Sequence, residues 1–244
     1  MNLNLDGKVA LVTGSYRGTG AGIAERLGAE GAHVIVHGFL EDETQVVFEQ
    51  LANKEINVTR LEANLLDLDH DEIKSLLPPI DILINNYGTP RRSSWESTES
   101  WIEEWEHNVL MGVKLSQVVI GGMSDRGWGR ILFMGTIGIE NPGTHSPGYY
   151  GSKAALVPIV KSLARELNQT GITVNLINPG MIAPAEVKEM LQKSARKKGI
   201  EADWFEIERW ATSEFMPNLT GRLSTPESIG DIVAFLVSDL AFQI

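Results

Sequence analysis

Short apolar runs rich in β-branched residues alternate with longer amphipathic segments, and this alternation restricts the possible folds more than any other feature. The apolar runs cover residues 9–14, 33–38, 56–63, 80–86, 130–136 and 172–178. Helical patterns lie near 19–30, 42–54, 69–77, 97–124 and 149–169. Runs that are apolar on both faces suit strands covered by helices on both sides. The pattern therefore predicts an α/β fold, a doubly wound parallel sheet of the Rossmann type.

The bulk composition is that of a globular domain. The chain has 244 residues, of which 43% are hydrophobic and 22% charged, and it shows no repeat, linker or domain boundary. These values predict a single domain over residues 1–244 that can bury a sizeable core. The formal net charge of -11 would repel a phosphate backbone, so we expect no nucleic-acid partner.

Two absences narrow the expected function further. The sequence contains no cysteine, which removes disulfides, thiolate nucleophiles and thiolate metal ligands together, and we expect no metal site. The first residues lack a basic stretch and carry only a short apolar run, which is too short for a signal peptide or a membrane span. We therefore expect a cytoplasmic protein without a membrane partner.

Residues 181–222 interrupt the alternation of strands and helices. They follow the turn N-P-G at 178–180 and contain two amphipathic patterns, over 183–199 and 202–215. An insertion beside the carboxyl end of a strand often forms a lid or a pocket wall, so we expect a helical substrate lid. A helical pair that only covers the sheet edge is the alternative. The large apolar side chains of the segment are Trp204, Phe205, Trp210, Phe215 and Met216.

The segment T-G-S-Y-R-G-T-G at residues 13–20 lies between the first expected strand and the first expected helix. Glycines there allow a tight turn and let backbone N–H groups approach a pyrophosphate at the positive end of a helix. The spacing is G-x-x-x-G-x-G rather than the commoner G-x-G-x-x-G. Because a strand precedes this segment and a helix follows it, the segment predicts a dinucleotide site.

The motifs together resemble those of the short-chain dehydrogenase/reductase family over essentially the whole chain. The matching elements occur in the family's order: T-G-x-x-x-G-x-G at 13–20, N-N-Y-G at 85–88, Asn108, M-G-T-I-G at 134–138, Tyr149-x-x-x-Lys153 and N-P-G at 178–180. Within the family, the chain is similar to bacterial 3-oxoacyl-carrier-protein reductases. The resemblance implies an NAD(P)(H)-dependent oxidoreductase that interconverts a ketone and a secondary alcohol. It also implies a homo-oligomer, either a dimer or a tetramer.

Two adjacent tyrosines are candidates for the proton transfer. Tyr149 and Tyr150 lie four and three residues before Lys153, and on a helix both spacings bring the phenol near the ammonium group. The family's catalytic tyrosine lies four residues before its lysine, so the resemblance selects Tyr149 as the general acid–base. A free phenol has a pKa of about 10. A cation within about 4–6 Å lowers the pKa of an acid by about 1–3 units, so we expect Lys153 to lower the pKa of Tyr149.

The other site residues are implied by the resemblance. Thr136 occupies the position where the family usually has serine, and its hydroxyl is expected to polarise a substrate carbonyl. Asn108 matches the asparagine that holds a water behind the lysine. The residues implied to contact the cofactor are Gly14, Ser15, Arg17, Gly18, Thr19, Gly20, Phe39, Asn64, Leu65, Asn86, Tyr87, Gly88, Tyr149, Lys153, Pro179, Gly180 and Ile182.

The end of the second expected strand bears on the choice of dinucleotide. In NAD-preferring relatives an acid near position 38 bonds the ribose 2′-hydroxyl, but position 38 here is glycine. Phe39 stands where many NADP-preferring relatives have a basic residue, which leaves Arg17 as the candidate partner of a 2′-phosphate. We therefore expect NADP(H) to be preferred, with NAD(H) as the alternative.

Four further features depart from the family's pattern. Asn64 replaces an aspartate that often contacts the adenine, and Tyr87 replaces a small alanine, which adds bulk near the cofactor. Pro184 stands where relatives often have a threonine that bonds the carboxamide. The sequence given stops at L-V-S-D-L-A-F-Q-I, where relatives continue into a final strand, so either this sequence is incomplete or that strand is missing.

The expected substrate is a small apolar or aromatic molecule. Relatives that act on acyl carrier protein present basic residues around the pocket mouth. Arg126 lies near one such place, but Thr170 occupies another, and the net charge of -11 disfavours docking of an acidic carrier. The alternatives are a non-enzymatic nicotinamide-nucleotide sensor or scaffold and a 3-oxoacyl-carrier-protein reductase. Dehydration or epimerisation with the same tyrosine is a third.

Overall fold

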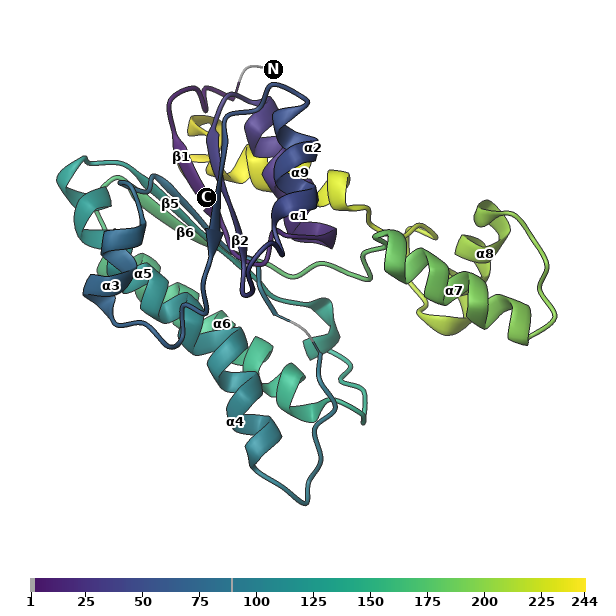
Figure 1. Ribbon diagram of the computed structural model, residues 1–244. Helices are drawn as coiled ribbons and strands as arrows, with labels where there is room; N and C mark the ends of the chain where they lie inside the picture. The colour runs from purple at the N-terminus through teal and green to yellow at the C-terminus, as the bar shows by residue number, and fades with distance from the viewer. Residues whose placement is uncertain (1–2, 89) are drawn as a thin grey trace.

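Six parallel strands form one sheet in the order β3-β2-β1-β4-β5-β6 (Figure 1). The computed structural model describes residues 3–88 and 90–244. The strands are β1 (Val9–Val12), β2 (His33–Gly38), β3 (Val58–Glu62), β4 (Ile82–Asn85), β5 (Gly129–Met134) and β6 (Ile172–Ile177). This arrangement confirms the predicted doubly wound fold. No strand follows β6 in the described part of the chain.

The strand order reverses between β1 and β4. Leu11 pairs with Ile35 of β2 on one side and with Leu83 of β4 on the other. The connections from β1 and from β4 therefore leave the sheet in opposite directions, which opens a crevice at the carboxyl ends of these two strands. Ligands of open α/β sheets bind at this kind of switch point.

Helices cover both faces of the sheet, and two of them project from it (Figure 1). They are α1 (Gly18–Ala29), α2 (Gln45–Ala52), α3 (His70–Leu76), α4 (Glu99–Trp105), α5 (Met111–Asp125), α6 (Pro147–Glu166), α7 (Ala185–Lys197), α8 (Trp204–Trp210) and α9 (Pro226–Val237). Single helical turns lie at Glu106–Leu110 and Ala211–Phe215, which are π-helical, and at Ile137–Ile139 and Asp239–Ala241. No helix in the described residues is long and apolar enough to cross a membrane.

Alternate residues of each strand enter two separate cores. Val12 and Val34 face the layer that contains α1, α2 and α9, whereas Leu11 and Ile35 face the layer that contains α3, α5 and α6. Both cores consist mainly of aliphatic side chains, because the strands are apolar on both faces. The sheet is therefore covered on both sides, and only its carboxyl edge is available for a ligand site.

The long helix expected over residues 97–124 is interrupted in the structure. A π-helical turn at Glu106–Leu110 separates α4 from α5. A π turn inserts one residue into the helical repeat, which rotates the following side chains and is frequent at functional sites. Asn108 lies in the middle of this turn. The sequence pattern had indicated one regular helix, because the apolar periodicity continues on both sides of the insertion.

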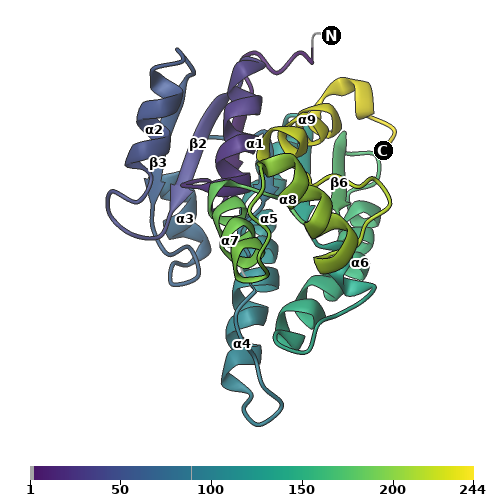
Figure 2. The ribbon, with the colours of Figure 1, turned by 90° about the vertical axis from the view of Figure 1, so that its right-hand side faces the viewer.

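Residues 181–222 form a small helical unit with its own core. Leu191 and Ala195 of α7 pack against Ile207 and Trp210 of α8. Short contacts join this unit to the rest of the chain, among them the hydrogen bonds Ala183 N–H to Ser224 O (2.8 Å) and Ser224 N–H to Met181 O (3.1 Å). Figure 1 shows α7 and α8 to one side of the sheet, and Figure 2 faces them directly.

Candidate active site

The turn after β1 has the geometry of a phosphate cradle. Gly14 and Gly18 have φ values of 63° and 55°, in the left-handed region that favours glycine. A Cβ on Gly20 would lie 2.6 Å from the carbonyl oxygen of Gly14, so this position accepts no side chain without displacement. The turn opens the N-terminus of α1, where unpaired N–H groups attract anions. The residues present therefore fit a pyrophosphate.

Side chains tie the cradle to the end of β4. The Thr13 hydroxyl accepts from the N–H groups of Asn86 and Tyr87, both at 3.0 Å, and donates to Ile84 O at 3.3 Å. The Asn86 amide donates to Thr13 O at 2.8 Å. These bonds fix the two strand ends on either side of the switch point, and Asn86 acts here as a structural brace of the cradle.

His37 ties the cradle to the two strands on its other side. Its Nδ1 accepts from the Gly14 N–H at 3.1 Å, and its Nε2 lies 3.1 Å from Ala63 O, so Nε2 carries the proton. The side chain is fully buried, and desolvation lowers the pKa of His37 to about 4. The neutral imidazole is therefore the form that holds the cradle. Sequence reasoning did not assign this residue.

Thr136, Tyr149 and Lys153 line one groove together with the cradle. The groove has a volume of about 520 Å³ and runs from Gly14 past the end of β5 to the lid unit. Thr136 follows β5, and its hydroxyl accepts from the Gly138 N–H at 3.1 Å. Tyr149 and Lys153 lie one turn apart on α6. The spacing expected from the sequence therefore places a phenol, an ammonium and a hydroxyl in the same groove.

The two tyrosines occupy different parts of this groove. Tyr149 has a hydrogen bond with Thr136, which lowers the pKa of Tyr149, but burial outweighs that bond. The Tyr150 ring packs on the loop after β5, where its Cε1 would lie 2.6 Å from a Cβ on Gly138. The rings meet edge to face at 5.4 Å. Tyr150 therefore forms a wall of the groove, and Tyr149 is the phenol beside the strand-end hydroxyl.

The expected lowering of the Tyr149 pKa is wrong for this structure. Burial raises the pKa of Tyr149 to about 12, and the neighbouring Tyr150 and Glu104 add to the rise. Burial also lowers the pKa of Lys153 to about 8. Desolvation disfavours the charged form of both groups and is the largest cause of each shift. Tyr149 is therefore a neutral proton donor near neutral pH.

Lys153 and Asn108 meet behind the tyrosine. The Lys153 ammonium is 3% exposed and donates to Met134 O at 2.7 Å. The ammonium and Asn108 Oδ1 both approach the Cα of Gly88, where any side chain would collide with them. Asn108 Oδ1 is buried and has no hydrogen-bond partner in the described part of the chain. Asn108 lies behind the groove rather than on its wall.

Most residues predicted to contact the cofactor line this groove. Those that do so are Gly14, Arg17, Gly18, Thr19, Gly20, Asn86, Tyr87, Gly88, Tyr149, Lys153, Pro179, Gly180 and Ile182. The side chains of Ser15 and Leu65 are fully buried in the fold, so these two residues can offer a ligand only their backbone. Asn64 turns toward its own loop, where its amide donates to Asp67 at 2.8 Å.

Three aromatic side chains cluster beside the groove, around Tyr87. The Phe39 ring lies 4.4 Å from the Tyr87 ring, and the His107 ring lies 5.8 Å from that of Tyr87. The Tyr87 side chain packs on the cradle, since a Cβ on Gly14 would lie 2.8 Å from its Cδ2. The bulk expected from Tyr87 is therefore present, and Phe39 belongs to this cluster rather than to the groove wall.

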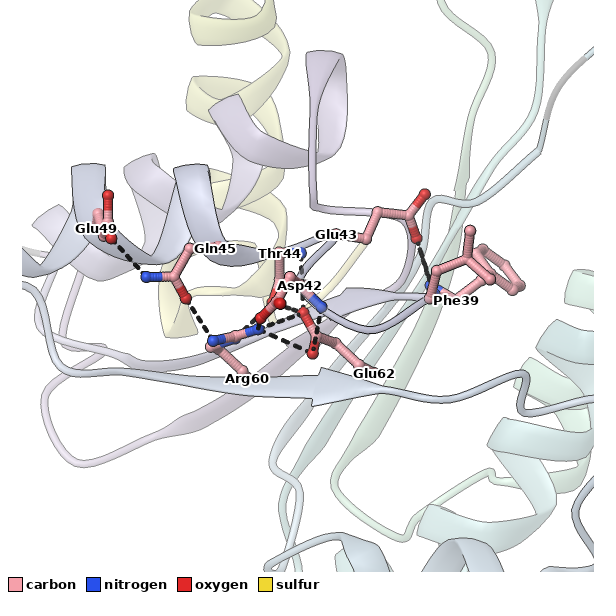
Figure 3. A network of polar contacts seen from close by, with 9 residues as sticks. Phe39, Asp42, Glu43, Thr44, Gln45, Glu49, Arg60 and Glu62 are labelled. Atoms are coloured by element: carbon pink, nitrogen blue, oxygen red, sulfur yellow. Dashed lines mark hydrogen bonds and ion pairs between the residues drawn. The ribbon is translucent and has the colours of Figure 1, made fainter.

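A carboxylate that the sequence did not indicate lies at the end of β2 (Figure 3). Glu43 Oε2 accepts from the N–H groups of Phe39 at 2.5 Å and Leu40 at 3.3 Å. A Cβ on Gly38 would lie 2.9 Å from the same oxygen. The acid missing at position 38 is therefore replaced in space by one that lies five positions later in the chain.

The neighbouring arginine, Arg60, is engaged by two acidic side chains and by the neutral side chains of Thr44 and Gln45. Arg60 on β3 donates to both carboxylate oxygens of Glu62, at 2.8 and 2.9 Å, and to Asp42 at 3.0 Å (Figure 3). Arg17, by contrast, is exposed at the cradle, and its guanidinium lies 5.1 Å from the Tyr16 ring. Of these two cations, Arg17 is the one available to a phosphate.

Of the large apolar side chains singled out in residues 181–222, Met216 lines the groove and the described aromatics do not. Val187 and Met216 line the groove, and Glu186 Oε1 would lie 3.2 Å from a Cβ on Gly18. Trp210 is instead buried in the core of the lid unit, and Phe205 is 54% exposed and outside the groove. Trp204 packs at the edge of that core. These three aromatic side chains are therefore not part of the groove wall. The Phe215 side chain lies outside the described part of the structure.

This fold and this groove define a class of enzyme, and comparison with known families identifies it. Residues 8–195 match the family model described as short chain dehydrogenase. The chain belongs to that family and is an oxidoreductase of the Rossmann type. The resemblance drawn from the glycine turn, the tyrosine–lysine pair and Asn108 is thereby confirmed.

Individual relatives span the full length of the chain. The chain is 33% identical to the 3-oxoacyl-[acyl-carrier-protein] reductase of Aquifex aeolicus, covering 100% of this chain and 95% of that protein. It is 30% identical to the D-beta-hydroxybutyrate dehydrogenase of Cupriavidus necator, covering 98% and 94%. Among solved structures, L-sorbose reductase from Gluconobacter frateurii, complexed with NADPH and L-sorbose, is 29% identical with a TM-score of 0.88, covering 100% and 94%.

Proposed function

We propose that this protein interconverts a ketone and a secondary alcohol on a small apolar or aromatic substrate, with Tyr149 as the general acid–base. The observation that carries the proposal is the convergence of Tyr149, Lys153 and Thr136 on the groove that also contains the glycine cradle. Family membership and this cradle make NAD(P)(H) the cofactor. A bound nicotinamide supplies hydride chemistry, and the chain's own residues position the reactants and move the proton.

Each of the three side chains has a distinct task. The Thr136 hydroxyl, beside the phenol, is placed to orient a carbonyl oxygen. Tyr149 has a pKa of about 12, so it carries the proton that a developing alkoxide needs. The Lys153 ammonium stabilises the phenolate left after that transfer, which is the moment when its charge is required. The chain is therefore arranged to donate a proton during ketone reduction.

The cofactor preference proposed is for NADP(H) over NAD(H). Arg17 supports it, because this guanidinium is exposed at the cradle while Arg60 is held by Glu62 and Asp42. Solved relatives with NADPH or NADP bound add support. Glu43 opposes the preference, because its carboxylate already occupies the N–H groups of Phe39 and Leu40. The proposal is that the attraction from Arg17 prevails.

A small substrate is favoured over an acyl group on a carrier protein. Arg126, which lies near the expected docking position, donates to Ile80 O at 2.6 Å and is paired with Asp81 at 3.2 Å. It therefore helps to hold the loop before β4 and presents little free positive charge. The far end of the groove is lined by Ile137, Met181, Val187 and Met216, which are all apolar.

The family resemblance further supports a homo-oligomer, which we propose as a dimer or a tetramer. Large apolar side chains are exposed on α9, where Ile232 is 47% and Phe235 is 39% accessible. They lie three residues apart and so share one face of the helix. The cytoplasmic location and the absence of a metal site remain predictions from the sequence.

The decisive experiment compares the two tyrosines. Tyr149→Phe should bind cofactor nearly normally and lose about 10²–10⁴-fold in turnover, because only the proton-transfer atom is removed. Tyr150→Phe is the matched control and should stay within about an order of magnitude of the parent. Turnover is followed by nicotinamide absorbance with a panel of ketones. Full activity in both variants would remove the chemical basis of the proposal and favour the sensor alternative.

A further inference from the structure

A buried glutamate lies beside the catalytic groove and has no role in the reaction described so far. Glu104 in α4 is 1% exposed. An ionisable side chain at that depth is rarely tolerated without a compensating partner. Glu104 lies four residues before Asn108, so the two side chains share one face of the α4 and π-turn segment.

Hydrogen bonds hold the Glu104 carboxylate between Asn108 and the backbone of Arg91. Its Oε2 accepts from Asn108 Nδ2 at 2.5 Å, and its Oε1 accepts from the Arg91 N–H at 2.6 Å. The bond to Glu104 fixes which end of the Asn108 amide faces away from α4. The other end, Oδ1, is therefore directed to the Cα of Gly88, where Lys153 Nζ also arrives.

Burial raises the pKa of the Glu104 carboxyl, and the charges of Arg91 and His107 act against that rise. Lys153 also lies within the field of this carboxylate. Arg91 supplies its backbone N–H to Glu104, but its guanidinium pairs with Glu103 at 2.8 Å. His107 is half-buried, and its Nδ1 lies 2.8 Å from Glu103 O. On α6, Lys153 is 3% exposed and donates to a neutral carbonyl. Among the described residues, Glu104 is the charged group that raises the pKa of Lys153, against the lowering by burial.

We propose that Glu104 is a positioning residue of the reaction, which supplies the buried counter-charge for Lys153 and fixes the orientation of Asn108. The proposal rests on the proposed function, since Lys153 matters only if Tyr149 transfers the proton. It explains why α4 is followed by a π turn: the extra residue rotates Asn108 so that its amide reaches both Glu104 and the lysine side. Without Glu104, Lys153 would hold its proton less firmly when the phenolate needs it.

The first test measures Lys153 directly in the cofactor-free protein. Lysine labelled at Cε is titrated by NMR in the parent and in Glu104→Gln. We expect the Lys153 pKa to fall by about 1 unit in the variant, because an opposite charge nearby is lost. Glu103→Gln is the matched control, one residue away on the same helix, and should leave the Lys153 pKa unchanged. An unchanged Lys153 pKa in Glu104→Gln would overturn the proposal. Glu104 would then only anchor the backbone at Arg91.

A reciprocal measurement serves if Glu104→Gln does not fold. Two coupled groups shift each other equally, so Lys153→Met should raise the pKa of Glu104, followed through its carboxyl carbon. No rise there would also overturn the proposal. Glu104→Asp keeps the negative charge, so the Lys153 pKa should stay close to its value in the parent protein.

Turnover measurements distinguish a failure of the Glu104 role from a failure of the proposed function. The limb of the kcat–pH profile that reports Lys153 should move to lower pH in Glu104→Gln by the same amount as the NMR value, while KM changes little. If Tyr149→Phe keeps full turnover, the proposed function fails whatever the Lys153 titration shows. If Tyr149→Phe is inactive and the titration is unchanged, only the role of Glu104 fails.

Discussion

A single histidine joins three elements of the cofactor groove. The imidazole of His37, on β2, reaches Gly14 after β1 and Ala63 after β3. Because Nδ1 must accept the Gly14 N–H, the bond exists only while the ring is neutral. Protonation would place two donors face to face at the cradle. The stability of the cradle therefore depends on keeping a proton off this ring.

The pH dependence of stability follows from the lowered pKa of His37. Between about pH 6.5 and pH 4 an unfolded chain binds the proton and the native chain does not, so stability falls as the pH falls through this window. From pH 7 to pH 5 the loss from this residue should be about 2 kcal/mol. Urea unfolding at both pH values measures it, and His37→Asn should lose correspondingly less.

His33→Asn is the control for that experiment. His33 lies on the same strand and faces Thr59 at 3.2 Å, away from the cradle. This variant should keep the pH dependence of the parent. Equal losses in the parent and in His37→Asn would show that other groups cause the acid sensitivity.

Arg17 and Glu43 carry opposite charges, so they should affect the binding of NADPH in opposite directions. Arg17→Ala should weaken the binding of NADPH by about 1.5–3 kcal/mol and that of NADH far less, because a charged hydrogen bond to NADPH is lost. Glu43→Gln should strengthen the binding of NADPH by about 1 kcal/mol, because a negative charge that repels the phosphate is removed. Fluorescence titration of the tryptophans gives both affinities. Asp42→Asn, which alters only a partner of Arg60, is the control, and tighter binding of NADH than NADPH by the parent would refute the preference.

At the scale of elements, the lid unit and the sheet should differ in their dynamics. The unit has its own core, and in the pocket Glu186 faces the cradle at Gly18, close to where a pyrophosphate would add negative charge. Cofactor should therefore displace Glu186 and change how the unit sits on the groove. Residues 185–215 should exchange amide hydrogens faster than the sheet without ligand, and more slowly with cofactor and substrate.

Hydrogen–deuterium exchange of peptides from the lid and from β5 checks this expectation. The β5 peptides are the internal control, because the strand is buried on both faces. Glu186→Gln should reduce the difference between the free and bound states. Strong and equal protection of the lid in every state would mean that it is a fixed cover of the sheet edge.

The elements were more predictable than the contacts between their side chains. Strand–helix alternation predicted the sheet because it depends on local periodicity, and the motif spacing predicted Thr136, Tyr149 and Lys153. Glu104 and Glu43 were missed, because a glutamate in a charged helical stretch resembles a solvent-exposed one until the packing is known. The raised pKa of Tyr149 was also missed, since the effect of burial cannot be derived from sequence spacing.

At the scale of the whole molecule, the proposed self-association can be measured directly. Sedimentation of the protein at micromolar concentration should give a dimer or a tetramer. Phe235→Glu should shift the protein toward monomer, because it places a charge on the apolar face that Phe235 shares with Ile232 on α9. Leu219→Glu, in a fully exposed loop of the lid unit, is the control and should leave the mass unchanged. A monomer in the parent protein would refute the proposal.

The separate core of residues 181–222 has a consequence for how this enzyme can diversify. Because Leu191, Ile207 and Trp210 pack mainly on one another, a substitution among them alters the packing of the unit and hardly that of the sheet. The reacting groups, on β5 and α6, belong to the other part. Under the proposed function, part of the substrate pocket and the proton-transfer groups are thus encoded in different stretches of the gene, and recombination could exchange the first while the second is inherited intact.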